Sequence, residues 1–207
     1  MKRVAALFIA LILLAACGKK EEKAPAPSPD MTTASSPSGN LSTPSSPPVP
    51  AAPPLFHIRD IDRRETSISF QDSRVLFRKI RQPIVFVTLF ADWCPPCRGM
   101  LPYLSKLQKE NSDELFVIGV LVNSDLDDEQ LRRFMLRHDS SFFISNHPDN
   151  DALGAFLARR YKLGENYPLP LTLIFKNGRY VMHISGAAPY EMLQNLVDQL
   201  KEKKREE

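Results

Sequence analysis

Cysteine is scarce in this 207-residue chain, which contains only three. Cys94 and Cys97 lie three positions apart, and Cys17 ends an apolar segment near the N-terminus. No cysteine is left to form a structural bridge between distant parts of the chain. The fold must therefore be stabilised by its hydrophobic core, and the roughly 150 residues beyond the N-terminal region are enough for a single one.

The sequence also lacks the patterns of several kinds of binding site. The net charge of +3 is small and scattered, and no basic face is interleaved with aromatic residues, so we expect no nucleic-acid partner. A zinc site would need two ligands besides the Cys94–Cys97 pair, and the sequence offers neither a free third cysteine nor two histidines at metal-ligand spacing. We expect no metal and no cofactor.

The N-terminus carries the pattern of an export signal. Lys2 and Arg3 form a basic start, and Val4 to Ala16 is an apolar stretch that is short for a membrane span but suits a signal peptide. The segment ends Leu14-Ala15-Ala16-Cys17, which resembles the lipobox of bacterial lipoproteins, in which the cysteine is lipidated and becomes the mature N-terminus. The alternative is an ordinary secretory signal. We expect a signal peptide over 1–16 and lipidation of Cys17, which would anchor the protein to a membrane.

Residues 17–54 join the predicted anchor to the rest of the chain. The stretch from Lys19 to Pro54 is rich in Pro, Ser, Ala and Thr and holds ten of the eighteen prolines. Such a composition buries too little apolar surface to fold, so we predict a disordered linker. In enteric bacteria an Asp after the lipidated cysteine retains lipoproteins at the inner membrane; Gly18 stands here, and the choice between inner and outer membrane stays open.

Residues 55–207 are predicted to form one α/β domain that begins with a small antiparallel unit. Leu55–Arg59 and Thr66–Phe70 alternate weakly in polarity and predict a hairpin. Asp72 is placed to cap a short helix, with Val75, Leu76 and Ile80 on one face.

A β-α-β unit is predicted to follow. Ile84–Phe90 is an unbroken apolar run, which favours a central strand covered on both faces. A helix runs from Cys94 to Glu110, with Pro102 inside it, and Leu115–Val122 reads as a second buried strand.

The rest of the chain predicts an αβ insertion, a hairpin and a final helix. The insertion comprises a helix around Leu131–His138, a strand at Ser141–Ser145 and a helix around Ala152–Leu157. Asn177-Gly178 is a strong two-residue turn between apolar strands. Pro189 begins the last helix.

The segment Trp93-Cys94-Pro95-Pro96-Cys97 lies between the central strand and its helix. Two thiols at this spacing can close a small disulfide, and the first lies where free N–H groups and the helix dipole favour a thiolate. A purely structural disulfide is the alternative, but so short a loop would stabilise little.

The order of these elements resembles the thioredoxin fold, a central mixed β-sheet flanked by helices, here with an N-terminal hairpin and a central αβ insertion. The resemblance rests on Trp93-Cys94-Pro95-Pro96-Cys97, on Pro102 and on Pro170 five residues before Phe175. Pro170 matches that fold's cis-proline, which faces the active-site disulfide. With the lipobox, the chain is similar to the membrane-tethered TlpA/ResA group, whose members reduce disulfides outside the cytoplasm, often in cytochrome c maturation.

The resemblance implies an enzyme, a protein-disulfide reductase that acts in the periplasm-facing cell envelope. It assigns attack to Cys94, resolution to Cys97, and substrate binding to Trp93, Leu169 and Pro170. The implied partners are exported disulfide-containing proteins such as apocytochrome c, and a transmembrane thiol electron donor; we expect a monomer. A thiol oxidase or isomerase of the same fold, and a non-catalytic binding module, are the alternatives.

Two residues at the pair depart from common patterns. The thioredoxin fold often has a buried acid six residues before the first cysteine, and Thr88 takes that position here. Another group or water must then carry the proton. Pro95 and Pro96 remove two N–H donors that would stabilise a thiolate, so we expect a reducing pair.

Overall fold

The protein is described by a computed structural model covering residues 52–202. Its elements, in chain order, are β1 (Leu55–Arg59), β2 (Glu65–Phe70), β3 (Val75–Phe77), β4 (Ile84–Phe90), α1 (Pro95–Glu110), β5 (Leu115–Leu121), α2 (Asp128–Arg137), β6 (Phe143–Ser145), α3 (Asn150–Arg160), β7 (Leu171–Lys176), β8 (Arg179–Ser185) and α4 (Tyr190–Glu202). The predicted signal peptide, Cys17 and most of the linker lie outside the described residues.

A five-stranded mixed sheet forms the centre, in the order β6-β5-β4-β7-β8. β4 pairs in parallel with β5 and antiparallel with β7, so its apolar run is covered by strands on both sides. Every residue of β4 is buried, because helices or strands also cover both of its faces.

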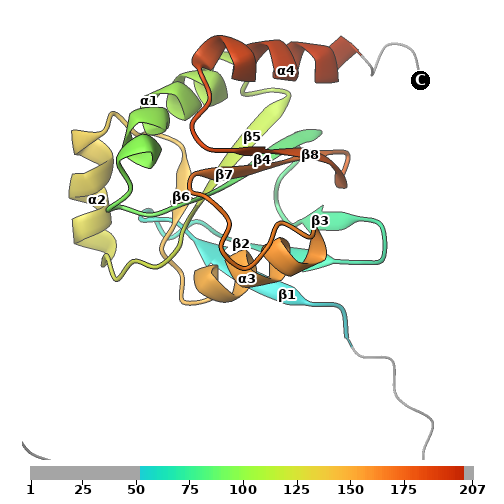
Figure 1. Cartoon of the computed structure of the whole chain (residues 1–207), viewed down its shortest axis with the longest axis horizontal. Helices are drawn as coiled ribbons and strands as arrows, with labels where there is room; N and C mark the ends of the chain where they lie inside the picture. The colour runs from blue at the N-terminus through green and yellow to red at the C-terminus, as the bar shows by residue number, and fades with distance from the viewer. Residues whose placement is uncertain (1–51, 203–207) are drawn as a thin grey trace, which may run out of the picture. The chain divides into compact units, whose positions relative to one another are not determined.

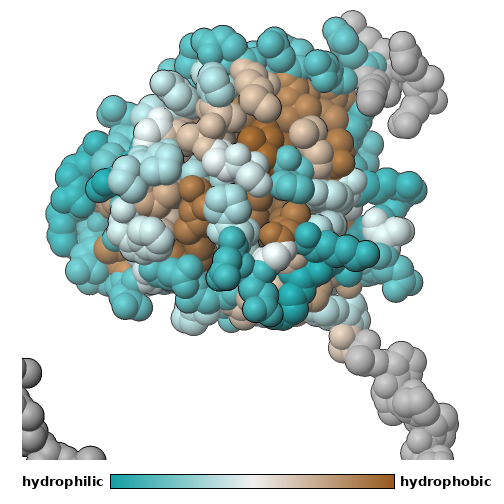
Figure 2. All heavy atoms as spheres, viewed as in Figure 1, coloured by the Kyte–Doolittle hydropathy of each residue, from teal (hydrophilic) through white to brown (hydrophobic). Residues whose placement is uncertain are grey.

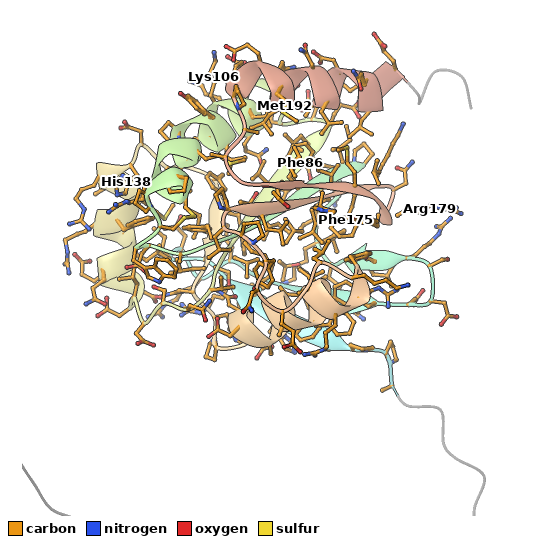
Figure 3. All side chains as sticks on the ribbon, in the orientation of Figure 1. Phe86, Lys106, His138, Phe175, Arg179 and Met192 are labelled. Carbon is orange, nitrogen blue, oxygen red and sulfur yellow. A yellow bond between two sulfur atoms is a disulfide. The ribbon has the colours of Figure 1, made fainter. Side chains whose placement is uncertain are left out.

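The two faces of the central sheet are covered by different elements (Figure 1) and have separate hydrophobic cores. Helices α1, α2 and α4 pack on one face, around Phe86 and Phe90 of β4. Helix α3 and the N-terminal sheet cover the other, where Phe175 of β7 meets Phe77 with ring centroids 5.3 Å apart. Figure 3 shows Phe86 on the α4 side and Phe175 on the β3 side.

The N-terminal unit has one more strand than the sequence predicted. The hairpin of β1 and β2 is confirmed, but the short helix expected after Asp72 is wrong: Val75–Phe77 forms β3, antiparallel to β2. The backbone N–H of Val75 also donates to the carbonyl of Gly178, at 2.7 Å. These hydrogen bonds satisfy the backbone of a segment too short for a stable helix, and tertiary pairing decides its structure.

The predicted turn at Asn177-Gly178 is confirmed. Both residues have positive φ, 52° and 73°. A Cβ atom on Gly178 would lie 2.5 Å from the carbonyl oxygen of Val75, so this turn needs glycine for space as well as for conformation. The turn thereby fixes the N-terminal sheet against the central one.

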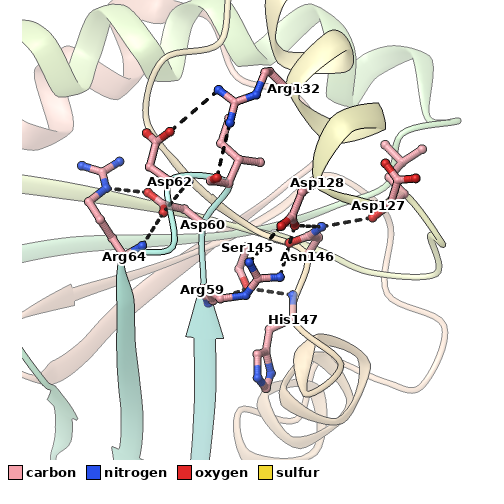
Figure 4. Close-up of polar contacts among 12 residues, drawn as sticks. Arg59, Asp60, Asp62, Arg64, Asp127, Asp128, Arg132, Ser145, Asn146 and His147 are labelled. Atoms are coloured by element: carbon pink, nitrogen blue, oxygen red, sulfur yellow. Dashed lines mark hydrogen bonds and ion pairs between the residues drawn. The ribbon is translucent and has the colours of Figure 1, made fainter.

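Polar contacts join the N-terminal sheet to the αβ insertion (Figure 4). Arg59 of β1 forms a bidentate pair with Asp128 at the start of α2, with N–O distances of 3.0 and 3.1 Å. Asn146 also donates to Asp128, at 3.0 Å. Asp127 and Gln130 form a capping box that fixes where α2 begins.

An apolar area lies on the surface beside α4 and β8 (Figure 2). Met182 of the edge strand and Met192 of α4 are both exposed there. Among residues 52–202, no helix has the length and apolar character needed to cross a membrane.

Candidate active site

Cys94 and Cys97 form a disulfide at the start of α1, with an S–S distance of 2.07 Å. Cys94 is the N-cap of the helix, and Pro95 opens it. Because Pro95 and Pro96 have no N–H, the first donor of the helix belongs to Cys97, and it reaches the Cys94 sulfur at 3.3 Å. The sequence therefore leaves one backbone donor to stabilise negative charge on Cys94.

The two sulfurs differ in access. Cys94 lines a groove of about 790 Å³. Cys97 does not line it, and its side chain packs into the core beneath the first turn of α1. In the disulfide both side chains are largely buried, 4% exposed for Cys94 and 1% for Cys97. An incoming molecule in the groove meets Cys94 first.

Pro170 lies across from the disulfide, and its bond to Leu169 is cis. The carbonyl oxygen of Leu169 is 3.7 Å from the Cys94 sulfur. Leu169 lines the groove, while Pro170 is buried behind it. The structure thus brings Cys94, Leu169 and Pro170 together, as the sequence predicted for a thioredoxin-like site.

Trp93 forms an exposed wall of the groove, with 61% of its surface accessible. Its indole N–H donates to the backbone carbonyl of Asn123, at 3.1 Å. The N–H of Asn123 in turn donates to the carboxylate of Asp151 in α3, at 2.8 Å. This chain of hydrogen bonds fixes the orientation of Trp93, which the sequence had identified only as a flat contact surface.

Tyr167 also lines the groove. Burial raises the pKa of Tyr167, and the negative charge of Asp151 adds to the shift. A Cβ atom on Gly154 would lie 2.9 Å from the Tyr167 hydroxyl, so the glycine lets the ring lie close against α3. Tyr167 is therefore uncharged at neutral pH, and its ring lies close against α3.

Sequence reasoning missed the contribution of α3 to the site. Asn123, Asp151, Ala155 and Tyr167 line the groove but come from two loops and a helix far from Cys94 in sequence. These amino-acid types are common in any domain, and only the fold brings the four residues together. Tyr167 had one usable signal, its place three residues before Pro170.

Thr88 occupies the position where the thioredoxin fold often has an acid. Its side chain is 1% exposed and lies 3.0 Å from the hydroxyl of Thr172 on the paired strand. By the alternation of β4, Thr88 faces the same side as Phe86 and Phe90, the side covered by α1. A neutral hydroxyl pair therefore stands on the disulfide's side of the sheet.

A site for a metal ion is not found in the described part of the chain, where no three His, Cys, Asp or Glu residues come together in a suitable group. His147 and Asp149 lie close together in the loop before α3, near His57 of β1, and the Asp149 carboxylate already accepts from the backbone N–H of His57 at 2.8 Å.

A groove beside a Cys-x-x-Cys disulfide and a cis-proline, on a mixed sheet flanked by helices, defines a thioredoxin-like redox protein. A model of the AhpC/TSA family matches residues 54–184. The chain belongs to the AhpC/TSA family, and the predicted thioredoxin-like fold is confirmed.

Individual relatives are distant. The chain is 38% identical to "Thioredoxin-like protein YneN" of Bacillus subtilis over 61 residues, which are 29% of this chain and 36% of that protein. It is 22% identical to "Thiol-disulfide oxidoreductase ResA" of Bacillus cereus over 63% of this chain and 70% of that one. The chain thus spans about a third of the first relative and more of the second.

Solved structures share the fold at low identity. A thiol:disulfide interchange protein of the thioredoxin family from Chlorobium tepidum superimposes with a TM-score of 0.53 at 17% identity. The alignment covers 73% of this chain and 99% of that one. At this identity the match shows the fold alone.

Proposed function

We propose that the protein is a thiol–disulfide oxidoreductase that reduces disulfides in other polypeptides. One observation carries the proposal: of the two bonded sulfurs, Cys94 opens into the groove and Cys97 lies behind it. A structural disulfide needs no such groove. Relatives named thiol-disulfide oxidoreductases support the same activity.

The first step is attack by Cys94. In the reduced protein, the Cys94 thiolate attacks one sulfur of the substrate disulfide, and the other substrate sulfur leaves as a thiolate that takes a proton. The Cys97 N–H and the N-terminus of α1 stabilise the Cys94 thiolate before attack. The product is a mixed disulfide between Cys94 and the substrate.

The second step is resolution by Cys97. The Cys97 thiolate attacks the Cys94 sulfur, and the second substrate thiolate leaves and is protonated. The substrate disulfide gains two electrons and becomes two thiols, while the protein's two thiols become the Cys94–Cys97 disulfide. Since Thr88 is not an acid, we assign the proton of Cys97 to the departing thiolate or to water.

The pair is proposed to act as a reductant. Pro95 and Pro96 leave a single backbone donor for the Cys94 thiolate, and no histidine lies between the cysteines. A weakly stabilised thiolate favours the disulfide form of the protein and hence a low potential. We expect a reduction potential closer to about −270 mV, the value of thioredoxin, than to about −120 mV, that of a strong oxidase. A reduction potential of about −120 mV would show instead that the pair acts as an oxidant of other proteins.

The place of action is proposed from the N-terminal sequence. The lipobox ending at Cys17 supports a protein tethered to a membrane, facing the periplasm, where electrons must come from a transmembrane thiol carrier. Exported disulfide proteins, among them apocytochrome c, are the proposed substrates. Mass spectrometry of the mature N-terminus tests the anchor: the expected result is a diacylglyceryl group on Cys17, which a Cys17→Ser variant lacks.

An insulin-reduction assay tests the activity. The wild-type protein is expected to reduce insulin with dithiothreitol as electron source, and Cys94→Ser is expected to fall to the rate without protein. Cys17→Ser is the matched control, because it replaces a cysteine but leaves the Cys94–Cys97 pair intact. Activity that survives Cys94→Ser, or is absent from wild type, would contradict the proposal. Cys97→Ser, which stops after the first step, would trap substrates as mixed disulfides.

A further inference from the structure

The groove extends well past the disulfide, to a helix that takes no part in the sulfur chemistry. Cys94 lies at one side of it, and Ala155 and Ala158 of α3 lie at another. The volume of about 790 Å³ exceeds what one disulfide fills and falls in the range, about 300–1,000 Å³, of pockets that enclose a whole ligand. Something larger than two sulfur atoms fits there.

On α3 the groove is lined by two small side chains, which lie between the charged Asp151 and Arg159. Ala155 is exposed in the groove, and Ala158 lies one turn further on and is buried. Residues three apart lie on the same side of a helix, so the two methyl groups together form a shallow apolar surface. An apolar surface of this kind gains free energy when an apolar side chain covers it.

The walls of the extension are fixed in place. Trp93 is held by Asn123, and Asn123 by Asp151, through hydrogen bonds of 3.1 and 2.8 Å. Tyr167 lies close to Gly154 of α3. Trp93 and Tyr167 thus line the groove together with the alanines of α3, and a subsite whose side chains are already positioned costs little entropy to occupy.

We propose that Ala155 determines specificity: with Trp93 and Tyr167 it forms a subsite for a bulky apolar side chain that lies beside the cysteine of a polypeptide substrate. The occupant is the substrate chain itself, because the subsite is continuous with the groove into which Cys94 opens. The inference rests on the proposed function and adds to it a preference among disulfides.

The test compares two disulfides that differ only beside the cysteine. Each is a symmetric dimer of a short peptide joined by one disulfide, with either Phe or Ala as the cysteine's neighbours. The reduced full-length protein in detergent is mixed with each dimer, and the fluorescence of Trp93, the only tryptophan, follows oxidation of the adjacent Cys94. Hydroxyethyl disulfide serves as a reference without side chains. We expect the Phe dimer to react about tenfold faster than the Ala dimer.

Substitutions on α3 assign the preference to Ala155. Ala155→Phe fills the subsite, and we expect the Phe-to-Ala rate ratio to fall to near one, with Ala155→Leu intermediate. Ala152→Phe is the matched control: Ala152 is an exposed alanine of the same helix that does not line the groove, and the ratio should stay near ten.

The outcomes are distinguishable. A wild-type ratio near one, or a ratio that survives Ala155→Phe, would overturn the subsite while hydroxyethyl disulfide still reacts and the proposed function stands. A reduced protein that reacts with none of the three disulfides would overturn the function and the subsite together.

Discussion

Two of the hollows formed by residues 52–202 are nearly equal in size, and only one of the two is a candidate for chemistry. The active-site groove measures about 790 Å³, and a second hollow of about 760 Å³, here called the acidic hollow, lies among Arg59, residues 124–129 and residues 146–151. Both are bordered by the αβ insertion. Volume alone does not distinguish them.

The difference lies in what the lining side chains already do. In the acidic hollow, Asp128 pairs with Arg59 (Figure 4). Asp127 caps α2, and Glu129 pairs with Arg133. In the groove, Cys94 borders the hollow as part of the reactive disulfide, although only 4% of it is exposed, and Trp93 is largely open to solvent. The acidic hollow is therefore a polar joint between the N-terminal sheet and the insertion, and the groove is where reactive and apolar surface is left for another molecule.

The buried Thr88–Thr172 pair lies on the disulfide's side of the sheet, and breaking it should have the largest effect on stability. Thr88→Val leaves the hydroxyl of Thr172 without its partner in a site that is 0% exposed. We expect a loss of about 1–3 kcal/mol in the free energy of unfolding, measured by urea denaturation. The double variant Thr88→Val/Thr172→Val removes both hydroxyls and should recover most of that loss. If Thr88→Val unfolds with the wild-type free energy, the Thr88–Thr172 hydrogen bond does not stabilise the fold. The same follows if the double variant loses as much stability as the two single variants added together.

The fold was largely predictable because its signals are local and strong. Three segments each predict a single structure, and each has that structure: the apolar run Ile84–Phe90, the helix start at Cys94–Pro96 and the turn at Asn177-Gly178. The segment at Val75–Phe77 has no such signal. Three residues can be a helical turn or a strand, and the backbone contact to Gly178 decides it.

The candidate site was predictable only in part, because only some of its residues carry a local signal in the sequence. Cys94, Cys97 and Pro170 have side chains or backbone chemistry that mark them in any sequence. Ala155 and Asn123 do not. An alanine lines a groove only when a helix some sixty residues away is packed beside the disulfide. Small residues at a site are invisible to motif reasoning because what they contribute is space.

Asp151 sharpens the comparison because it borders both hollows. Asp151→Ala removes the acceptor of the Asn123 N–H, and Asn123 has a positive φ of 51° that the contact helps to hold. Trp93 would then lose its fixed position. We expect KM for insulin to rise about fivefold, equivalent to about 1 kcal/mol, with kcat little changed because Cys94 is untouched.

Asp151→Asn is the control for this prediction. The amide oxygen can still accept from Asn123, so we expect it to restore most of the wild-type KM. If both variants behave alike, or if KM is unchanged in Asp151→Ala, then Asp151 does not position Trp93 and the groove does not depend on α3 in this way.

Asp128 gives the smallest effect and tests the acidic hollow itself. The Arg59–Asp128 pair is partly exposed, with 26% and 39% of the side chains accessible, so Asp128→Ala should cost no more than about 1 kcal/mol of stability at neutral pH.

The hydrogen bonds from Arg59, and then from Asn146, lower the pKa of Asp128 below its ordinary 3.8. A lowered pKa in the folded state means that the stabilisation is complete above the unfolded value and is lost as pH falls through the folded one. The difference between wild type and Asp128→Ala, measured by urea denaturation, should therefore be constant from about pH 7 to 5 and shrink below about pH 4. Insulin reduction should stay at the wild-type rate. If Asp128→Ala slows reduction as much as Asp151→Ala does, the two hollows are not separate in function and the contrast drawn between paired and open side chains is wrong.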